Sequence, residues 1–147
     1  MDVYALIVLY SDMMNRQDIF DWCKKTYKVS PDYPWNDDNA VLRHKDNRKW
    51  FGVVLSLRSD RLPPSGSTDP GCTYDESCQF LDILNVKCDP VMIGSFLTKS
   101  GYFPAYHMNK DKWISILLDG PEPDDEIKML LDISFEMTRP KKRPGRK

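Results

Sequence analysis

Apolar side chains at helical spacing predict a first helix that begins near Asn15. They share one face and recur every three or four residues. Asn15 can cap the N-terminus, and Asp18 lies in the first turn, where the helix dipole favours an acid. The helix should end before Ser30-Pro31, because the segment PDYPWNDDN is loop by composition. Its apolar face consists of Ile19, Trp22, Cys23 and Tyr27.

Two further helices carry clear start signals. Asp89-Pro90 places a capping acid before a proline at the first helical position, and Gly101 suits the position just after the helix. The last helix opens at Asp124, with acids in a first turn that the helix dipole favours. The second helix has the apolar stripe Ile93, Phe96 and Leu97, and the last has the inner face Ile127, Leu130, Leu131, Ser134 and Thr138, flanked by Phe135.

Alternating apolar residues predict two hairpins and one further strand. Residues 41–57 form a hairpin around Asp46-Asn47, two residue types that tolerate the left-handed turn conformation. Residues 80–88 are a strand, and 102–107 with 112–118 form a second hairpin around the turn MNKD. The second strand of the first hairpin should have one buried and one half-covered face. One face consists of Phe51, Val53, Leu55 and Leu57, and the other of Trp50, Gly52, Val54 and Ser56.

The order of these elements predicts an α+β fold. Five strands without alternating βαβ units favour a two-layer domain of order α-β-β-β-α-β-β-α, with helices packed on a mainly antiparallel five-stranded sheet. We place the domain at residues 14–139, an N-terminal extension at 1–13 and a basic disordered tail at 140–147. Residues 58–79, with three prolines and two glycines, are expected to form a long loop insertion.

Composition is that of a globular protein of one domain. The chain has 147 residues, of which 41% are apolar and 12% aromatic. The early apolar run 3–10 is shorter than the roughly 20 residues that span a bilayer, and it lacks signal-peptide features. We therefore expect a cytoplasmic protein, in which Cys72 and Cys78 are reduced thiols rather than a disulfide.

Charge is segregated along the chain. The net charge is −1, but residues 43–49 carry +3, residues 107–113 carry +1 and residues 138–147 carry +6, which leaves −11 for the rest. The positive segments are turns and a tail, as in many proteins that contact nucleic acid.

Several segments of the chain are similar to a known family. They are MNRQDIFDWCKK, the DYPW loop, KWFGVVLSL, LNVKCDP, GYFPAYHMNKDKWISILLDG and DEIKMLLDISFEMT, which together run from Met14 to about Arg139. On these residues the chain resembles the MmcQ/YjbR family, whose fold is likened to frataxin (CyaY) and to secretion chaperones. The resemblance implies a predicted DNA-binding protein with a double-wing motif. The extension 1–13 and the long 58–79 loop depart from the compact family pattern.

Resemblance and charge together indicate duplex DNA as a partner. Basic side chains at two hairpin turns would act as wings on the phosphates, which position a protein without reading sequence. The tail adds an RPGR segment similar to minor-groove arms. Alternatively, these charges keep the turns soluble and block edge pairing. The candidate DNA-binding residues are Arg43, Lys45, Arg48, Lys49, His107, Asn109, Lys110, Lys112, Arg143 and Arg146.

Some of these residues have a structural interpretation that we favour. Asn109 would bond to the backbone of its own turn, and His107 would pack on Trp113 across the hairpin. Trp50 and Trp113 could stack on bases, but packing within the sheet is the commoner role.

No enzyme signature occurs in the sequence. GxSxG, HExxH, Walker and GxGxxG motifs are absent, and no spacing of His44, His107 and a cysteine indicates a metal site. We expect no enzyme activity, no cofactor, no membrane partner and a monomer. The second functional hypothesis is a protein-interaction or chaperone-like module, which would hold an unidentified protein on its sheet face or the 58–79 loop.

Overall fold

The computed structural model describes residues 14–61, 80–120 and 122–140. Within these ranges the chain forms three α-helices and one five-stranded sheet, in the predicted order. The predictions for the extension 1–13, for Cys72 and Cys78, and for Arg143 and Arg146 in the tail fall outside the described residues. The elements are α2 (Arg16–Tyr27), β1 (Ala40–Arg43), β2 (Trp50–Arg58), the 3-10 helix η1 (Ser59–Arg61), β3 (Phe80–Lys87), α3 (Pro90–Phe96), β4 (Tyr102–Pro104), β5 (Trp113–Leu117) and α4 (Asp124–Thr138).

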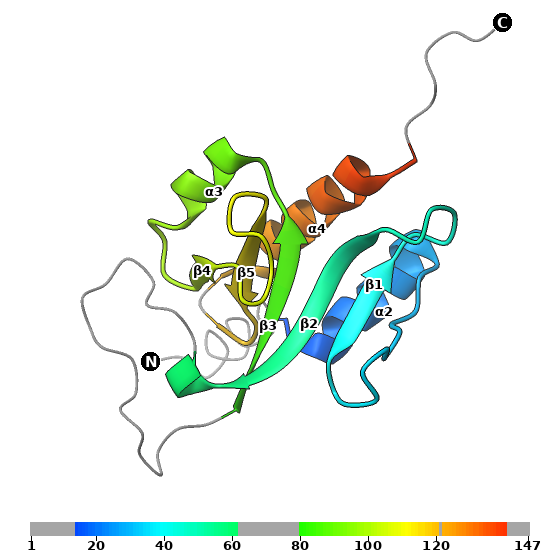
Figure 1. Cartoon of the computed structure of the whole chain (residues 1–147), viewed down its shortest axis with the longest axis horizontal. Helices are drawn as coiled ribbons and strands as arrows, with labels where there is room; N and C mark the ends of the chain where they lie inside the picture. Colours follow the sequence, from blue (N-terminus) through cyan, green and yellow to red (C-terminus); the bar gives the residue numbers. More distant parts are fainter. Residues whose placement is uncertain (1–13, 62–79, 121, 141–147) are drawn as a thin grey trace, which may run out of the picture.

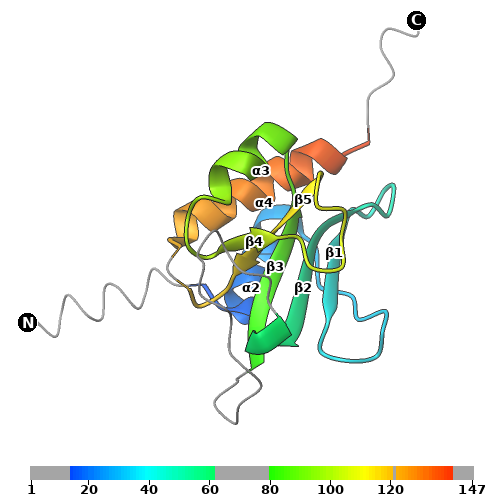
Figure 2. The ribbon, with the colours of Figure 1, turned by 60° about the vertical axis from the view of Figure 1, so that its left-hand side comes forward.

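The sheet is antiparallel throughout and has the order β1-β2-β3-β5-β4. In Figure 1, α2 and α4 lie behind the sheet, and the loop between β4 and β5 lies in front of it. Figure 2 shows the same arrangement from a second direction, with the helices on one side of the strands. The molecule is therefore the predicted two-layer α+β domain.

The main core lies between the sheet and the helices. Every residue predicted for the inner face of α4 is buried, with Thr138 the most exposed of them at 3%. On α2, Ile19 and Cys23 are fully buried, and Trp22 and Tyr27 pack against the same cluster. The helical periodicity thus predicted the inner face of α4 and most of that of α2, but it missed Phe20, which is also buried.

The predicted helix starts are also present. Asn15 Oδ1 accepts a hydrogen bond from the backbone N–H of Asp18 at 2.9 Å, and the Asp18 carboxylate accepts one from Asn15 N at 3.1 Å. Such a reciprocal capping box satisfies two backbone donors that the helix leaves open. Asp89 caps α3 with a single hydrogen bond, which its carboxylate accepts from Val91 N at 2.9 Å. Gly101, with a φ of 90°, lies in the turn that enters β4, five residues beyond the end of α3, so its predicted capping role is wrong.

The second face of the sheet carries its own apolar cluster. Val41, Val53, Leu55, Leu57 and Ile83 are buried there, and Trp50, Tyr106, Met108 and Leu117 pack against them. Val53, Leu55 and Leu57 are thus buried as predicted, whereas Val54, predicted on the half-covered face, is also fully buried, on the helix side.

A β-bulge explains one wrong prediction in β2. Leu42 pairs with Gly52, whereas the next residue, Arg43, pairs with Trp50, so Phe51 is the extra residue. The bulge turns Phe51 to the helix side, where it belongs to the main core, while Val53 faces the other side. The strict alternation of side chains between the two sheet faces therefore fails at the start of β2.

The second hairpin has shorter strands than predicted. β4 ends at Pro104 instead of residue 107, and β5 begins at Trp113. The chain between them crosses the second face of the sheet rather than extending β4, and Met108 packs against that face. The turn MNKD is consequently part of a longer loop, residues 105–112.

Candidate nucleic-acid interface

Both basic turns lie at the same end of the sheet. β3 ends there, and since β2 and β5 run antiparallel to β3, both begin there, with Gly52 opposite Val86 and Trp113 opposite Lys87. One strand separates them, so the bases of the two turns are roughly 10 Å apart at ordinary strand spacing. We call the surface formed by residues 44–49 and 109–112 the basic end.

The first turn presents three exposed cations, Lys45, Arg48 and Lys49. It is closed by hydrogen bonds from His44 N to Lys49 O at 2.9 Å and from Arg48 N to His44 O at 3.1 Å. The sequence predicted Asp46 or Asn47 in the left-handed conformation of this turn. The residue that adopts it is Arg48, with a φ of 65°. Asn47 instead supports the turn with its side chain, which accepts a hydrogen bond from Lys49 N at 3.0 Å.

The first turn is anchored to the end of α4. His44 is 5% exposed, and its Nε2 lies 3.0 Å from Phe135 O and 2.8 Å from Thr138 Oγ1. Asn47 Nδ2 donates to Thr138 O at 3.0 Å. The C-terminal end of α4 therefore lies beside the first turn.

The structure adds two residues that sequence reasoning missed. Lys24 and Lys28, in the last turn and the cap of α2, face the first turn across a concavity of about 460 Å³. Lysines at a helix C-terminus are usually explained by the helix dipole, and only the antiparallel pairing of β1 and β2 places them beside another basic cluster. The charged residues that line the concavity are Lys24, Lys28, Asp32, Arg43, Lys45 and Arg48.

Arg43 differs from its neighbours because it has an acidic partner. Its guanidinium pairs with the Asp32 carboxylate, and its side chain is only 20% exposed. Its Nε is buried without a hydrogen bond. We therefore regard Arg43 as the wall of the concavity, whereas the exposed lysines and Arg48 are the groups free to meet an anion.

The second turn is built around Asn109, as the structural interpretation predicted. Asn109 Oδ1 accepts a hydrogen bond from Asp111 N at 2.9 Å, and Asn109 O accepts one from Trp113 N at 2.9 Å. Lys110 and Lys112 are exposed on this turn. Asn109 is thus a turn former, and the two lysines are the groups available for contact.

His107 lies elsewhere than predicted. Its ring packs against Tyr106, with 4.0 Å between ring centroids, rather than against Trp113. Its φ is 60° and its side chain is exposed on the second face of the sheet. His44 faces the helices, so the two histidines point to opposite sides of the sheet and cannot share a metal ion.

A closed ring of hydrogen bonds holds the 105–112 loop on the sheet. Tyr106 N donates to Ser115 Oγ at 3.0 Å, Ser115 Oγ donates to Asn85 Oδ1, and Asn85 Nδ2 donates to Tyr106 O at 2.9 Å. Asn85 and Ser115 are cross-strand neighbours and fully buried. Two polar residues inside apolar strands were the sequence signal for this anchor.

The opposite end of the sheet carries a cluster of acidic side chains. Asp18 and Asp82 lie near Asp119, and burial together with these two charges raises the pKa of Asp119. Arg16 partly offsets them through two hydrogen bonds of 2.9 Å to Asp82. An acidic cluster therefore lies at this end of the sheet, where β2 also ends in Arg58.

The described part of the chain gives little support to a metal site, a reactive thiol or a membrane span. No three His, Cys, Asp or Glu side chains within residues 14–61, 80–120 and 122–140 are grouped to hold a metal ion. Burial raises the pKa of the Cys23 thiol to about 12 and also raises that of Cys88, so both thiols stay protonated at neutral pH. Among the described helices, none is long and apolar enough to cross a membrane.

We predict that His44 makes stability fall in mild acid. Burial, the largest effect, lowers the pKa of His44 below its usual 6.5. The unfolded chain therefore binds the proton more readily, and the free energy of unfolding decreases as the pH falls from about 6.5 towards the lowered folded pKa. Urea unfolding at pH 7.5 and pH 5.5 measures this loss, and His44→Gln should reduce the difference between the two values.

The second histidine supplies the control. His107 is exposed and makes no hydrogen bond within the described residues, so His107→Gln should keep the pH dependence of the parent. Equal pH dependence in the parent and in His44→Gln would show that His44 is not the responsible group.

The fold and the basic end define a class of small α+β domain with helices on one sheet face and two basic turns at one end. A model of the YjbR family matches residues 24–137, and the chain belongs to this family. The family resemblance seen in the sequence is thereby confirmed.

Relatives agree with this assignment. The uncharacterized protein YyaQ of Bacillus subtilis (strain 168) is 36% identical over 129 residues, which cover 86% of this chain and 100% of YyaQ. A crystal structure of a Pseudomonas syringae protein is similar, with a TM-score of 0.74 and 38% identity over 86% of this chain and 100% of that one. A Deinococcus radiodurans crystal structure, with a TM-score of 0.60 and 20% identity over 88% of this chain and 81% of that one, shares the fold.

Proposed function

We propose that this protein binds duplex DNA weakly through the basic end. The observation that carries the proposal is that two basic turns, far apart in sequence, lie one strand apart at the same end of one sheet. Their bases are separated by roughly 10 Å, comparable to the width of about 12 Å of the major groove, so each turn can reach phosphates beside one groove.

The kind of side chain limits what such an interface can read. Lys45, Lys110 and Lys112 are flexible point charges that suit phosphate oxygens. Phosphate contacts give affinity without base selectivity, and that affinity depends strongly on salt. We therefore expect general duplex binding without selection of a base sequence.

The proposal is tested by the salt dependence of duplex binding. Roughly four phosphate contacts give a slope of about −3 to −4 in a plot of log affinity against log salt concentration. The double variants Lys45→Gln/Arg48→Gln and Lys110→Gln/Lys112→Gln should each flatten the slope by about 2, since each removes two contacts. Fluorescence anisotropy with a labelled duplex at several salt concentrations measures these slopes.

A control separates local contact from total charge. Gln17→Glu/Lys128→Gln also changes the net charge by two units, but at α2 and the first turns of α4, away from the basic end. It should leave the slope unchanged. Melting temperatures should stay close to the parent for all three variants, because exposed charges contribute little to stability. Absence of salt-dependent binding in the parent would contradict the proposal and favour a protein-interaction module instead.

A further inference from the structure

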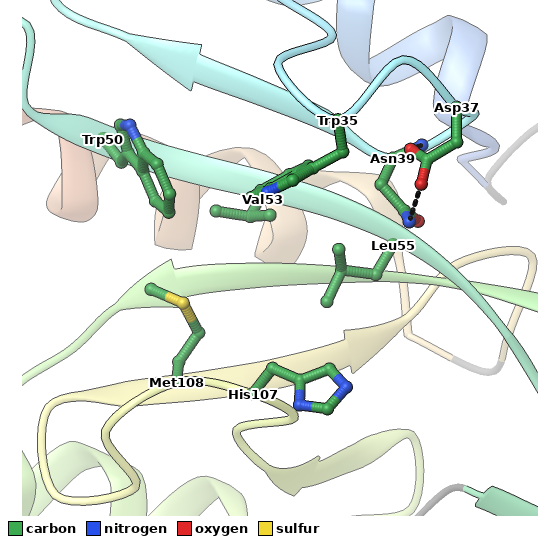
Figure 3. A pocket seen from close by; sticks show the side chains of 8 residues that line it. All are labelled: Trp35, Asp37, Asn39, Trp50, Val53, Leu55, His107 and Met108. Carbon is green, nitrogen blue, oxygen red and sulfur yellow. Dashed lines mark hydrogen bonds between the residues drawn. The ribbon is translucent and has the colours of Figure 1, made fainter.

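A slot opens on the second face of the sheet, away from the helices. Its volume is about 470 Å³, within the range of small-molecule sites. Figure 3 shows Trp35 and Trp50 on one side of β2 and Met108 and His107 on the other, with Val53 and Leu55 between them. The slot therefore has an aromatic wall of Trp35 and Trp50, a second wall of Met108 and His107 from the 105–112 loop, and an apolar floor.

The aromatic wall is open to solvent. Trp35 is 47% exposed, although an indole is among the largest apolar side chains. It meets Trp50 edge to face, with 5.8 Å between ring centroids and 84° between ring planes. Neither indole N–H makes a hydrogen bond within the described residues. The two rings thus form an apolar corner, which offers a planar guest the exposed indole of Trp35, a perpendicular neighbour and two unused donors.

A carboxylate lies at the far end of the slot from Trp50 and Met108. Asp37 accepts hydrogen bonds from Asn39 N at 2.8 Å and from Asn39 Nδ2 at 3.2 Å, which fix its orientation (Figure 3). An ionised carboxylate can accept about four hydrogen bonds, so Asp37 retains acceptor capacity. It is the one charged side chain among the residues that line the slot, and it favours a guest with N–H donors.

The slot continues into a second, basic compartment. This smaller cavity, of about 240 Å³, shares Asn39, Leu55 and His107 with the slot. Arg58 and Arg61 line it, and the Arg61 side chain is exposed. Within the pair of cavities, the aromatic part is acidic and the adjoining part is basic.

We propose that these two cavities form one binding site for a planar nitrogen heterocycle that carries an anionic group, the chemistry of a nucleoside monophosphate. The ring stacks on Trp35, with Trp50 at its edge, its N–H groups donate to Asp37, and the phosphate lies at Arg61. The site lies on the face of the sheet and uses none of the exposed cations of the basic end, so it stands independently of DNA binding.

Indole N–H signals in NMR spectra of the full chain test the site. GMP should shift the signals of Trp35 and Trp50 in a saturable way, and leave Trp22, which packs beside Tyr27 on the helix side, unchanged. GMP should bind about tenfold more tightly than guanosine, because only GMP carries the anion. Inorganic phosphate alone should leave both signals in place.

Three variants assign the parts of the site. Trp35→Ala should weaken GMP binding about tenfold, and Trp35→Phe less, as expected for stacking. Arg61→Gln should lower the affinity for GMP to that for guanosine and leave guanosine binding unaffected. Val91→Ala, which trims an apolar side chain that is 82% exposed on α3, serves as the matched control and should change nothing.

Several results would overturn the site. These are the absence of shifts at millimolar GMP, equal affinity for GMP and guanosine, and displacement of GMP by an equal concentration of inorganic phosphate. Failure here is distinct from failure of the DNA proposal. Trp35→Ala should keep the salt slope of duplex binding, and the two basic-end double variants should keep GMP binding.

Discussion

Ser134→Ala is expected to lower the free energy of unfolding by about 2–4 kcal/mol, a large effect for the loss of one oxygen atom. The Ser134 hydroxyl is fully buried in α4 and makes two hydrogen bonds to the sheet. It accepts one from Lys87 N at 2.9 Å and donates one to Phe51 O at 2.6 Å. Alanine would leave both backbone groups buried without a partner.

The geometry shows why no other group can replace this hydroxyl. Gly52 and Val86 are the last paired residues of β2 and β3, and the next pair in register would be Phe51 with Lys87. Ser134 Oγ stands between that N–H and that C=O, so it bridges the two strands where the bulge separates them. The hydroxyl thus helps set how far the β1–β2 turn diverges from the rest of the sheet at the basic end.

A matched control is Ser95→Ala. Ser95 is an exposed serine in α3, so its replacement should change stability by less than about 0.5 kcal/mol. Urea unfolding of the parent and both variants gives the comparison. A Ser134→Ala protein as stable as Ser95→Ala would show that the strands close directly on each other without the hydroxyl.

Sequence reasoning predicted this serine on the buried face of α4 but not its role. Helical periodicity depends only on local geometry, so the inner face of α4 and the cap at Asn15 could be predicted fully. The place of Phe51 could not, because a bulge shifts the alternation by one residue and depends on pairing with β1. The same limit applies to Ser134, whose partners belong to two strands distant in sequence.

At the basic end, too, local sequence predicted some features, whereas others depended on the tertiary structure. The basic side chains of the two turns could be found from local charge and turn residues. Their common location required the strand order, since only the antiparallel register of β2, β3 and β5 brings both turns to one end. Lys24 and Lys28 lie beside the first turn because of the pairing of β1 with β2, which local patterns do not reveal either. The slot at Trp35 was missed because its walls come from three separate segments.

Asn85→Leu is expected to destabilise the fold by about 2–4 kcal/mol and to release the 105–112 loop. Leucine keeps the branching of the asparagine side chain, but it is larger and cannot replace the hydrogen bonds of Asn85 to Ser115 and to Tyr106 O. The Tyr106 carbonyl would lose its side-chain partner, and Ser115 Oγ would lose its acceptor. Because Asn85 is fully buried, water cannot reach these groups without opening the loop.

The consequence should extend beyond stability to both proposed sites. Hydrogen exchange of the Tyr106 amide, which is bonded to Ser115 Oγ, should accelerate in Asn85→Leu, and the turn that carries Lys110 and Lys112 should lose its fixed position. The salt slope of duplex binding and the affinity for GMP should then both decrease.

Gln17→Leu, the same kind of change at an exposed amide on α2, should leave stability, exchange and binding close to the parent. If Asn85→Leu unfolds at the urea concentration of the parent and keeps slow exchange at Tyr106, the buried ring of hydrogen bonds does not hold the loop. In that case the apolar contacts of Tyr106 and Met108 with the sheet are sufficient to hold it.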